Sequence, residues 1–297
     1  MTDATQVLRV EHETAYEYAA RVDLAYHIAY LRPAQTEYQQ VETFALEIDP
    51  APSHRTTGRD AYGNQRDAFS LYGPHEELRV NAASSVRVTA RFDGLDPASS
   101  PAWSEVREEL EYHAGAEFQP ETEFVFASPF VPRLPQLRDY AARSFPPARP
   151  LLVGALDLMR RIHADFTYDT ESTEVSTPLA VAFKQRRGVC QDYAHVAMGA
   201  LRALGLPAAY VSGYLLSTPP PGQPRLIGAD ASHAWVRVWC PVNGWVEFDP
   251  TNDCLVGSGH ITLAIGRDYG DVTPVRGVIR GGGKHALAVR VSVLPIA

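Results

Sequence analysis

The stretch of residues 187–216 constrains the fold of this chain more than any other part of the sequence. It begins with a glycine-containing loop that ends at Cys190. Apolar residues then recur at the spacing of one helix face, and Gly205 and Pro207 supply the usual signals for a helix end. The residues that follow are mostly apolar and predict a buried strand over 210–216. The sequence therefore predicts a loop, a helix and a strand in this order, with Cys190 at the helix start.

A cysteine at the start of a helix has distinctive chemical surroundings. The positive end of the helix dipole and the unpaired backbone N–H groups of the first turn both favour the thiolate of Cys190. The same N–H groups can stabilise an oxyanion. Asp192 lies in this first turn, where a structural role beside the free N–H groups is favoured over a catalytic one. The alternative for Cys190 is a small buried apolar side chain, which is what most free cysteines are.

Two later segments supply a base and a carboxylate. Residues 231–239 alternate like a strand and contain His233. Residues 244–252 form a second strand that ends in a turn after Asp249, and the Cys-Pro-Val-Asn-Gly stretch between the two segments suits a hairpin loop. Antiparallel neighbours lie about 5 Å apart, so Asp249 can orient the imidazole of His233. Together with Cys190, this predicts a nucleophile, its base and the group that orients the base.

Four nearby residues have weaker claims to a role. Gln191 is a candidate side-chain donor to the oxyanion, and Trp235, on the same side of the strand as His233, either shields the site from water or fills the core. His195 does not share a helix face with the thiol and is expected to be a core histidine. Asp253 could replace Asp249, but it lies beyond the turn.

Four sequence motifs carry a family resemblance. G-V-C-Q-D-Y-A-H, L-R-A-L-G-L-P-A-A-Y-V-S-G-Y, S-H-A-W-V-R-V and G-W-V-E-F-D-P-T-N resemble the core motifs of the transglutaminase-like superfamily, in particular of its bacterial cysteine-protease-like branch. The resemblance implies that Cys190 is the nucleophile, His233 the base and Asp249 the third member of a triad. Ala209 departs from the pattern, because an arginine is expected there, and this puts a local salt bridge in doubt.

The rest of the chain suggests two structured parts. Residues 1–95 contain strand-like segments separated by turn signals and are similar to the β-rich domain that often precedes this core, with Asp60, Gly63 and Asn64 expected to form a turn. Residues 96–150 are rich in proline and are expected to form a linker with one short helix. Residues 151–297 are expected to form the catalytic core with C-terminal strands. The predicted fold class is α+β, a papain-like or transglutaminase-like core preceded by an all-β N-terminal domain.

The composition of the chain limits the classes of binding partner and the cellular compartment that we expect. The formal net charge is −8 and no basic stripe is present, which argues against nucleic acid or an anionic membrane as a partner. The first residues carry no basic-then-apolar signal and no apolar run is long enough to span a bilayer, so we expect a cytoplasmic protein. The three cysteines have no disulfide-framework or metal-like spacing. No cofactor or metal is expected, and no signal indicates a protein partner or an oligomeric state.

These residues predict thiol chemistry on a peptide or amide substrate. Hydrolysis is the favoured outcome, since water is abundant and no acceptor site for an amine is evident. An acyltransferase or transglutaminase and a catalytically idle binding module are the alternatives. The loop over residues 218–230 either overhangs the site and helps to select substrate, or is an inert insertion.

Overall fold

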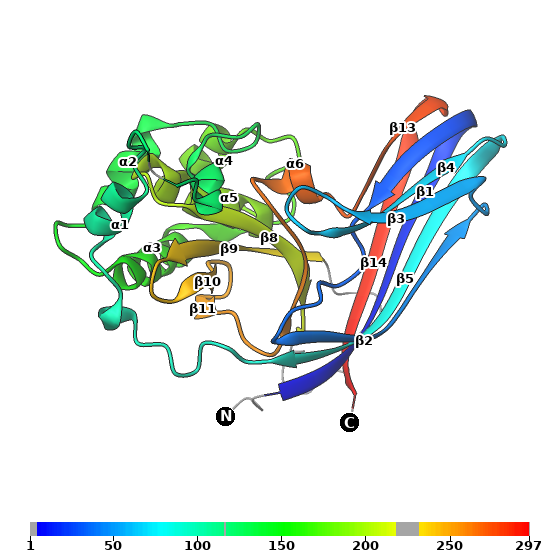
Figure 1. Cartoon of the computed structure of the whole chain (residues 1–297). Coiled ribbons are helices and arrows are strands. Elements are labelled where there is room, and N and C mark those ends of the chain that lie inside the picture. The colour runs from blue at the N-terminus through cyan, green and yellow to red at the C-terminus, as the bar shows by residue number, and fades with distance from the viewer. Residues whose placement is uncertain (1–4, 116, 218–231, 297) are drawn as a thin grey trace, which may run out of the picture.

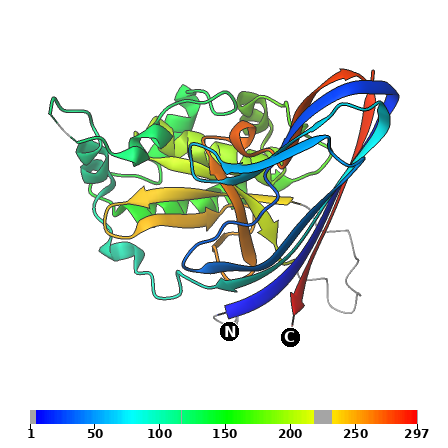
Figure 2. The ribbon, with the colours of Figure 1, turned by 45° about the vertical axis from the view of Figure 1, so that its right-hand side comes forward.

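The computed structural model describes residues 5–115, 117–217 and 232–296. The loop considered as a substrate-selecting segment, residues 218–230, lies outside this part of the chain. The described residues form a curved N-terminal sheet beside a core in which helices pack on a second sheet (Figure 1, Figure 2). No helix in the described ranges is long and apolar enough to cross a membrane.

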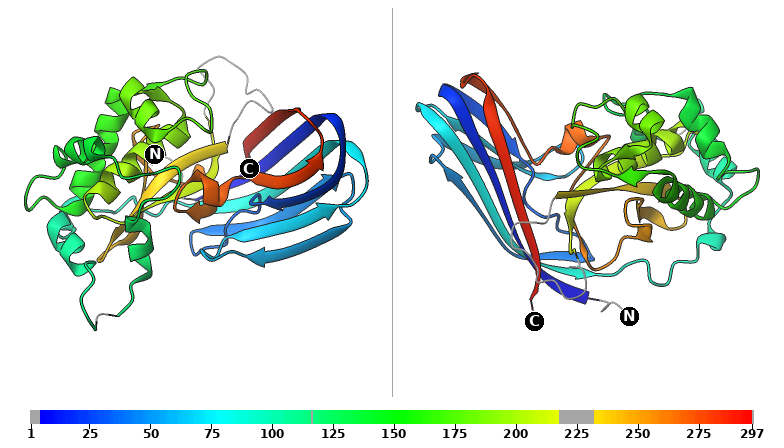
Figure 3. Two further views of the ribbon diagram at one scale, coloured as in Figure 1. Left: turned by 90° about the horizontal axis from the view of Figure 1, so that it is seen from above. Right: turned by 180° about the vertical axis from the view of Figure 1, so that it is seen from behind.

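The N-terminal sheet is organised around one long strand, β1. The first half of β1 lies between β5 and β14, and its second half lies between β4 and β13, all antiparallel. The seven strands of this sheet are β1 (Thr5–Ala29), β2 (Gln39–Asp49), β3 (His54–Arg59), β4 (Gln65–Leu71), β5 (His75–Thr89), β13 (Val275–Gly281) and β14 (His285–Ile296). Seen from above, these strands curve around a shared interior (Figure 3). Apolar side chains such as Ala25, Leu78 and Val80 fill this interior.

The sequence correctly indicated strands here but not their partners. The C-terminal strands β13 and β14, which we expected to belong to the catalytic core, pair instead with β1 of the N-terminal sheet. Alternating residues predict that a segment is a strand, whereas its neighbour depends on contacts distant in sequence. Strand β3 was not expected, because all of its residues are exposed and it lacks an apolar face.

The core contains a five-stranded sheet in the order β11-β10-β9-β8-β12. Its strands are β8 (Ala208–Leu215), β9 (Ser232–Cys240), β10 (Gly244–Asp249), β11 (Cys254–Leu255) and β12 (His260–Gly266), and a separate two-stranded pair is formed by β6 (Thr167–Tyr168) and β7 (Arg187–Gly188). The helices are α1 (Trp103–Glu109), α2 (Pro135–Ala142), α3 (Leu151–Asp165), α4 (Leu179–Gln185), α5 (Cys190–Ala203) and α6 (Tyr269–Val272). Helix α5 and strand β8 confirm the helix and the strand predicted around Cys190.

The stretch expected as a linker, residues 96–150, contributes to this core. It contains 3₁₀ turns at Pro97–Ser99 and Pro120–Val125 as well as α1 and α2. Leu137 of α2 is fully buried, and a Cβ atom at Gly199 of α5 would lie only 2.6 Å from the Leu137 side chain. The glycine in α5 therefore lets α2 pack directly on the helix that carries Cys190.

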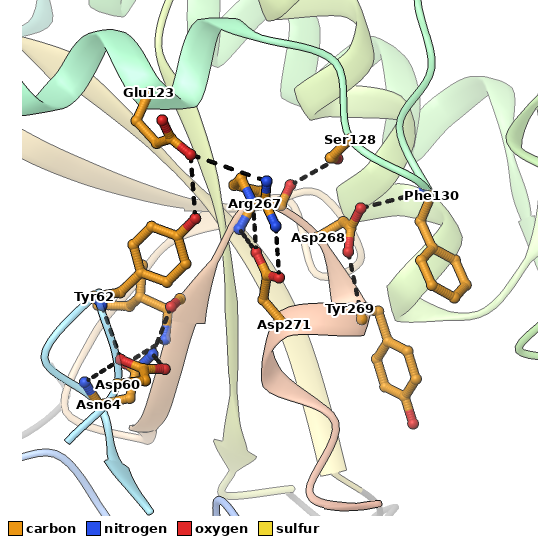
Figure 4. Close-up of polar contacts among 12 residues, drawn as sticks. Asp60, Tyr62, Asn64, Glu123, Ser128, Phe130, Arg267, Asp268, Tyr269 and Asp271 are labelled. Atoms are coloured by element: carbon orange, nitrogen blue, oxygen red, sulfur yellow. Dashed lines mark hydrogen bonds and ion pairs between the residues drawn. The ribbon is translucent and has the colours of Figure 1, made fainter. Parts of the chain in front are cut away.

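A tight turn between β3 and β4 fastens the N-terminal sheet to the core (Figure 4). Asp60 accepts hydrogen bonds from the backbone N–H groups of Tyr62 and Asn64, both at 2.9 Å. Gly63 has the positive φ, 82°, that the turn requires. The turn predicted for Asp60, Gly63 and Asn64 is confirmed. The Asn64 amide then bonds the backbone N–H and C=O of Ile265 on β12, at 2.8 and 2.7 Å.

Arg267, beside this turn, adds further polar contacts between the N-terminal sheet and the core (Figure 4). Arg267 binds the carboxylate of Asp271 through Nε at 2.9 Å and a terminal nitrogen at 3.1 Å, and it lies 4.0 Å from Glu123 (Figure 4). Glu123 in turn accepts a 3.3 Å hydrogen bond from the hydroxyl of Tyr62. Arg267 is thus linked through Glu123 to Tyr62, in the turn of the N-terminal sheet.

Candidate active site

Cys190 occupies the first position of α5, as the sequence predicted. The loop before it is held by Asp192, whose carboxylate accepts hydrogen bonds from the Val189 N–H at 2.9 Å and the Thr173 hydroxyl at 2.8 Å. A Cβ atom at Gly188 would lie 2.3 Å from that carboxylate, so only glycine fits. Burial raises the pKa of Asp192, and these two hydrogen bonds oppose that rise. The structural role expected for Asp192 is therefore confirmed.

The β9–β10 hairpin brings His233 and Asp249 into contact. His233 lies at the start of β9 and Asp249 at the end of β10, and the two strands pair from Gly244↔Cys240 to Phe248↔Val236. His233 Nε2 lies 2.7 Å from Asp249 Oδ2. The hairpin predicted from the sequence thus places the Asp249 carboxylate beside the His233 imidazole, as expected.

The thiol completes the arrangement from the other side. Cys190 Sγ lies 4.0 Å from the carbonyl oxygen of Ser232, the residue just before His233. Burial alone would lower the pKa of His233, but hydrogen bonds with Asp249 and then with Cys190 raise it above the ordinary value of an imidazole. Because Nε2 faces Asp249, Nδ1 is the ring nitrogen left for the thiol. The contacts with Asp249 and Cys190 thus favour the protonated form of the His233 imidazole.

Asp249 is fully buried yet surrounded by donors. Its Oδ1 accepts from the backbone N–H groups of Thr251 and Asn252 at 3.0 and 3.2 Å. Its Oδ2 accepts from His233, from Asn252 Nδ2 at 2.7 Å and from His260 Nε2 at 3.2 Å. Burial would raise the pKa of Asp249, but the bonds from His233 and His260 outweigh it and lower the pKa below its usual range. The carboxylate therefore stays ionised despite its burial.

Asn252 and His260 are the neighbours that sequence reasoning missed. Asn252 was read only as part of a turn, and a lone histidine at the start of a strand carries no pattern that assigns it a partner. Asn252 reaches Asp249 within the turn that follows β10. His260 reaches it from the start of β12, which β8 and β9 separate from β10 in the sheet.

His233, Asp249 and His260 also meet a simple distance test for a metal site. One ligand atom of each lies within 4.8 Å of the others. However, the Gly257 N–H donates to His260 Nδ1 at 3.2 Å, so Nε2 of this ring carries the proton. A protonated nitrogen that points at Asp249 offers no lone pair to a metal. The donor set fits a hydrogen-bond network better than a metal centre.

Trp235 and Gln191 lie beside the triad. The Trp235 side chain is fully buried, donates its indole N–H to Glu247 at 2.7 Å, and lies with its ring centroid 5.9 Å from that of His233. A Cβ atom at Gly213 would lie 2.4 Å from the indole, so this glycine makes room for the ring. The side-chain nitrogen of Gln191 donates to the carbonyl of Val175 at 3.3 Å.

The two remaining candidates lie away from the reacting groups. His195 is buried and accepts a 3.2 Å hydrogen bond from the Tyr269 N–H, which fits the predicted core histidine and ties α5 to α6. Burial, its largest influence, lowers the pKa of His195 to about 3. Asp253 lies exposed in the turn with a positive φ of 52°.

Comparisons with known proteins place these features in a family. Residues 139–250 match the transglutaminase-like superfamily, and residues 8–87 match the bacterial transglutaminase-like N-terminal region. An uncharacterized protein of Mycobacterium tuberculosis is 42% identical over 299 residues, which span 98% of this chain and 93% of that protein. A protein-glutamine gamma-glutamyltransferase of Pseudomonas aeruginosa is 36% identical over 107 residues, 35% of this chain and 16% of that enzyme.

A solved structure shares the fold along the whole chain. The crystal structure of a candidate cysteine protease from Cytophaga hutchinsonii covers 99% of this chain and 91% of its own, with a TM-score of 0.75 and 18% identity. At this identity the match supports the fold and not the activity. The range that matches the transglutaminase-like superfamily, residues 139–250, contains Cys190, His233 and Asp249. The chain therefore belongs to the transglutaminase-like superfamily and carries its bacterial N-terminal region.

Proposed function

We propose that this protein is a thiol-dependent hydrolase that cleaves a peptide or isopeptide bond. The observation that supports this function most is the continuous chain of contacts from Cys190 through His233 to the buried, ionised Asp249. The Cys190 side chain is only partly buried, so a substrate carbonyl can reach it. In this proposal Cys190 is the nucleophile, His233 the acid and base, and Asp249 the group that orients and charges the imidazole.

The reaction follows from these positions. The Cys190 thiolate attacks the amide carbon, and the negative oxygen is stabilised by the N–H groups of Cys190 and Gln191, which have no intrahelical acceptor in the first turn. His233 then donates its proton to the leaving amine, and the C–N bond breaks to leave a thioester. Water, deprotonated by His233, attacks the thioester carbon. The C–S bond then breaks, which releases the acid and restores the thiolate–imidazolium pair.

Acyl transfer is the second candidate function. An amine that replaces water in the last step would give a new amide, and the same three residues serve both outcomes. The similarity to a protein-glutamine gamma-glutamyltransferase supports this candidate, although it spans 16% of that enzyme. An idle binding module is less well supported, because the triad residues are all present and in contact.

A substrate screen tests the proposal directly. Purified protein is incubated with dipeptides and γ-glutamyl amides, with and without an added primary amine, and the products are identified by mass spectrometry. We expect free acid together with released amine or ammonia. A dominant covalent adduct with the added amine would favour the transferase, and no turnover of any substrate by protein with an intact thiol would favour the binding module.

The reactivity of the thiols provides a test that requires no substrate. In the folded protein near neutral pH, Cys190 should be alkylated by iodoacetamide at least about tenfold faster than Cys240 and Cys254, because an imidazolium and a helix start favour its thiolate. Cys240 is buried, and burial followed by the charge of Asp249 raises the pKa of Cys254 to about 12. Mass spectrometry after a short pulse measures the three rates, and equal labelling would argue against an activated nucleophile.

We also propose a cytoplasmic location. The three cysteines are unpaired, which suits a reducing compartment.

A further inference from the structure

We propose that His260 is a positioning residue for this reaction, a neutral donor that holds the Asp249 carboxylate toward His233. The inference rests on the proposed function of Cys190 and extends the triad by one member. His260 lies at the start of β12, which is separated from β10 by β8 and β9 in the sheet. Its Nε2 nevertheless reaches Asp249 Oδ2 at 3.2 Å.

The protonation state of His260 follows from its second nitrogen. The backbone N–H of Gly257 points at His260 Nδ1 at 3.2 Å. An amide N–H can only donate, so Nδ1 must accept and cannot carry a proton. The single proton of the neutral ring therefore lies on Nε2 and is donated to Asp249. The hydrogen bond from Gly257 is thus made only while Nδ1 is unprotonated.

The ring of His260 is held in place on its other sides. His260 is 7% exposed, and its ring lies edge-on to the Trp235 indole with 5.3 Å between the centroids. Trp235 is fully buried and fixed by its bond to Glu247. Because His260 cannot rotate away without breaking this packing, its N–H is directed at Asp249 before any substrate arrives.

The hydrogen bond from His260 to Asp249 should affect how the reactivity of Cys190 depends on pH. The titratable groups that face Asp249 are His233 from β9, His260 from β12 and Cys254 from β11, with Cys190 of α5 coupled through His233. Loss of the His260 donor leaves a buried carboxylate with one partner fewer, so Asp249 should take up a proton at a higher pH. A protonated Asp249 no longer supports the imidazolium, and the thiolate of Cys190 is then lost.

Three variants test this role. His260→Phe removes the donor, and His260→Gln offers an amide N–H to Asp249 and a carbonyl to Gly257. The matched control is His12→Phe, since His12 is an equally buried histidine that bonds Thr14 and Tyr214 away from the triad. The rate of Cys190 alkylation by iodoacetamide is measured between about pH 2 and pH 9 for each variant, a range that extends below the ordinary pKa of an aspartic acid, with circular dichroism to confirm folding at the acid end.

We expect His260→Phe to move the acid limb of this profile upward by about one pH unit, as loss of a direct hydrogen bond to a buried carboxylate implies. His260→Gln and His12→Phe should keep the limb of the wild type. An unmoved limb in His260→Phe, or an equal shift in His12→Phe, would overturn the proposal.

A second measurement keeps the two proposals separable. NMR of isotope-labelled wild-type protein distinguishes the two neutral tautomers of a histidine, and His260 should carry its proton on Nε2 throughout the neutral range. An Nδ1–H tautomer or an imidazolium would overturn the role of His260 even if Cys190 is reactive. If wild-type Cys190 reacts no faster than Cys254, the proposed function fails, and the tautomer still decides whether His260 donates to Asp249.

Discussion

Replacement of Cys190 by alanine is expected to abolish turnover while the protein stays folded. Cys190 begins α5 and its thiol hydrogen-bonds with the imidazole of His233. Without this thiol the proposed thioester cannot form. Loss of a nucleophile from a comparable catalytic unit lowers turnover by a factor on the order of 10⁴ to 10⁶. The measurement is turnover of a substrate found in the screen, with circular dichroism to confirm folding.

Cys254→Ala provides the matched control. Cys254 is also a partly buried thiol, and it pairs in register with Asp249 across β10 and β11. Its loss should change turnover by less than about threefold, since a substitution outside the reacting unit removes no interaction made in the transition state. If Cys190→Ala kept more than about one per cent of activity, far above what a lost nucleophile allows, the proposed nucleophile would be wrong.

The parts of the site that could be predicted from sequence are those set by local pattern. Cys190 is fixed by a loop, a helix and helix-end signals that are contiguous, and His233 and Asp249 are joined by one short hairpin. The spacing of apolar residues and the turn residues determine the geometry of each of these elements. The contact between His233 and Asp249 could therefore be predicted from the sequence.

The parts that could not be predicted depend on distant pairing. His260 reaches Asp249 only because β12 lies in the same sheet, on the far side of β8 and β9. Likewise, β14 pairs with β1 although the two strands lie at opposite ends of the chain. An alternating pattern specifies which face of a strand is buried but not which strand lies next to it.

Replacement of Asp249 by asparagine should lower turnover by roughly 10 to 10³, which is less than the factor of about 10⁴ known for a serine triad, because a preformed Cys–His pair depends less on its third member. The structure adds a cost in stability. The two carboxylate oxygens face separate sets of donors, backbone N–H groups of Thr251 and Asn252 on one side and side-chain donors, including His233, on the other. An amide has one oxygen, so its NH₂ group must face donors on one side, at a cost of about 1–3 kcal/mol. Thermal unfolding and turnover are therefore measured together.

Asp253→Asn is the matched control, because this carboxylate is exposed and asparagine tolerates its positive φ of 52°. It should keep near wild-type turnover and stability. The double variant Cys190→Ala with Asp249→Asn should turn over no more slowly than Cys190→Ala, since members of one catalytic unit are strongly non-additive. Normal turnover in Asp249→Asn together with a large loss in Asp253→Asn would show that Asp253, and not Asp249, orients the imidazole. A further loss in the double variant would mean that Asp249 acts outside the unit formed with Cys190.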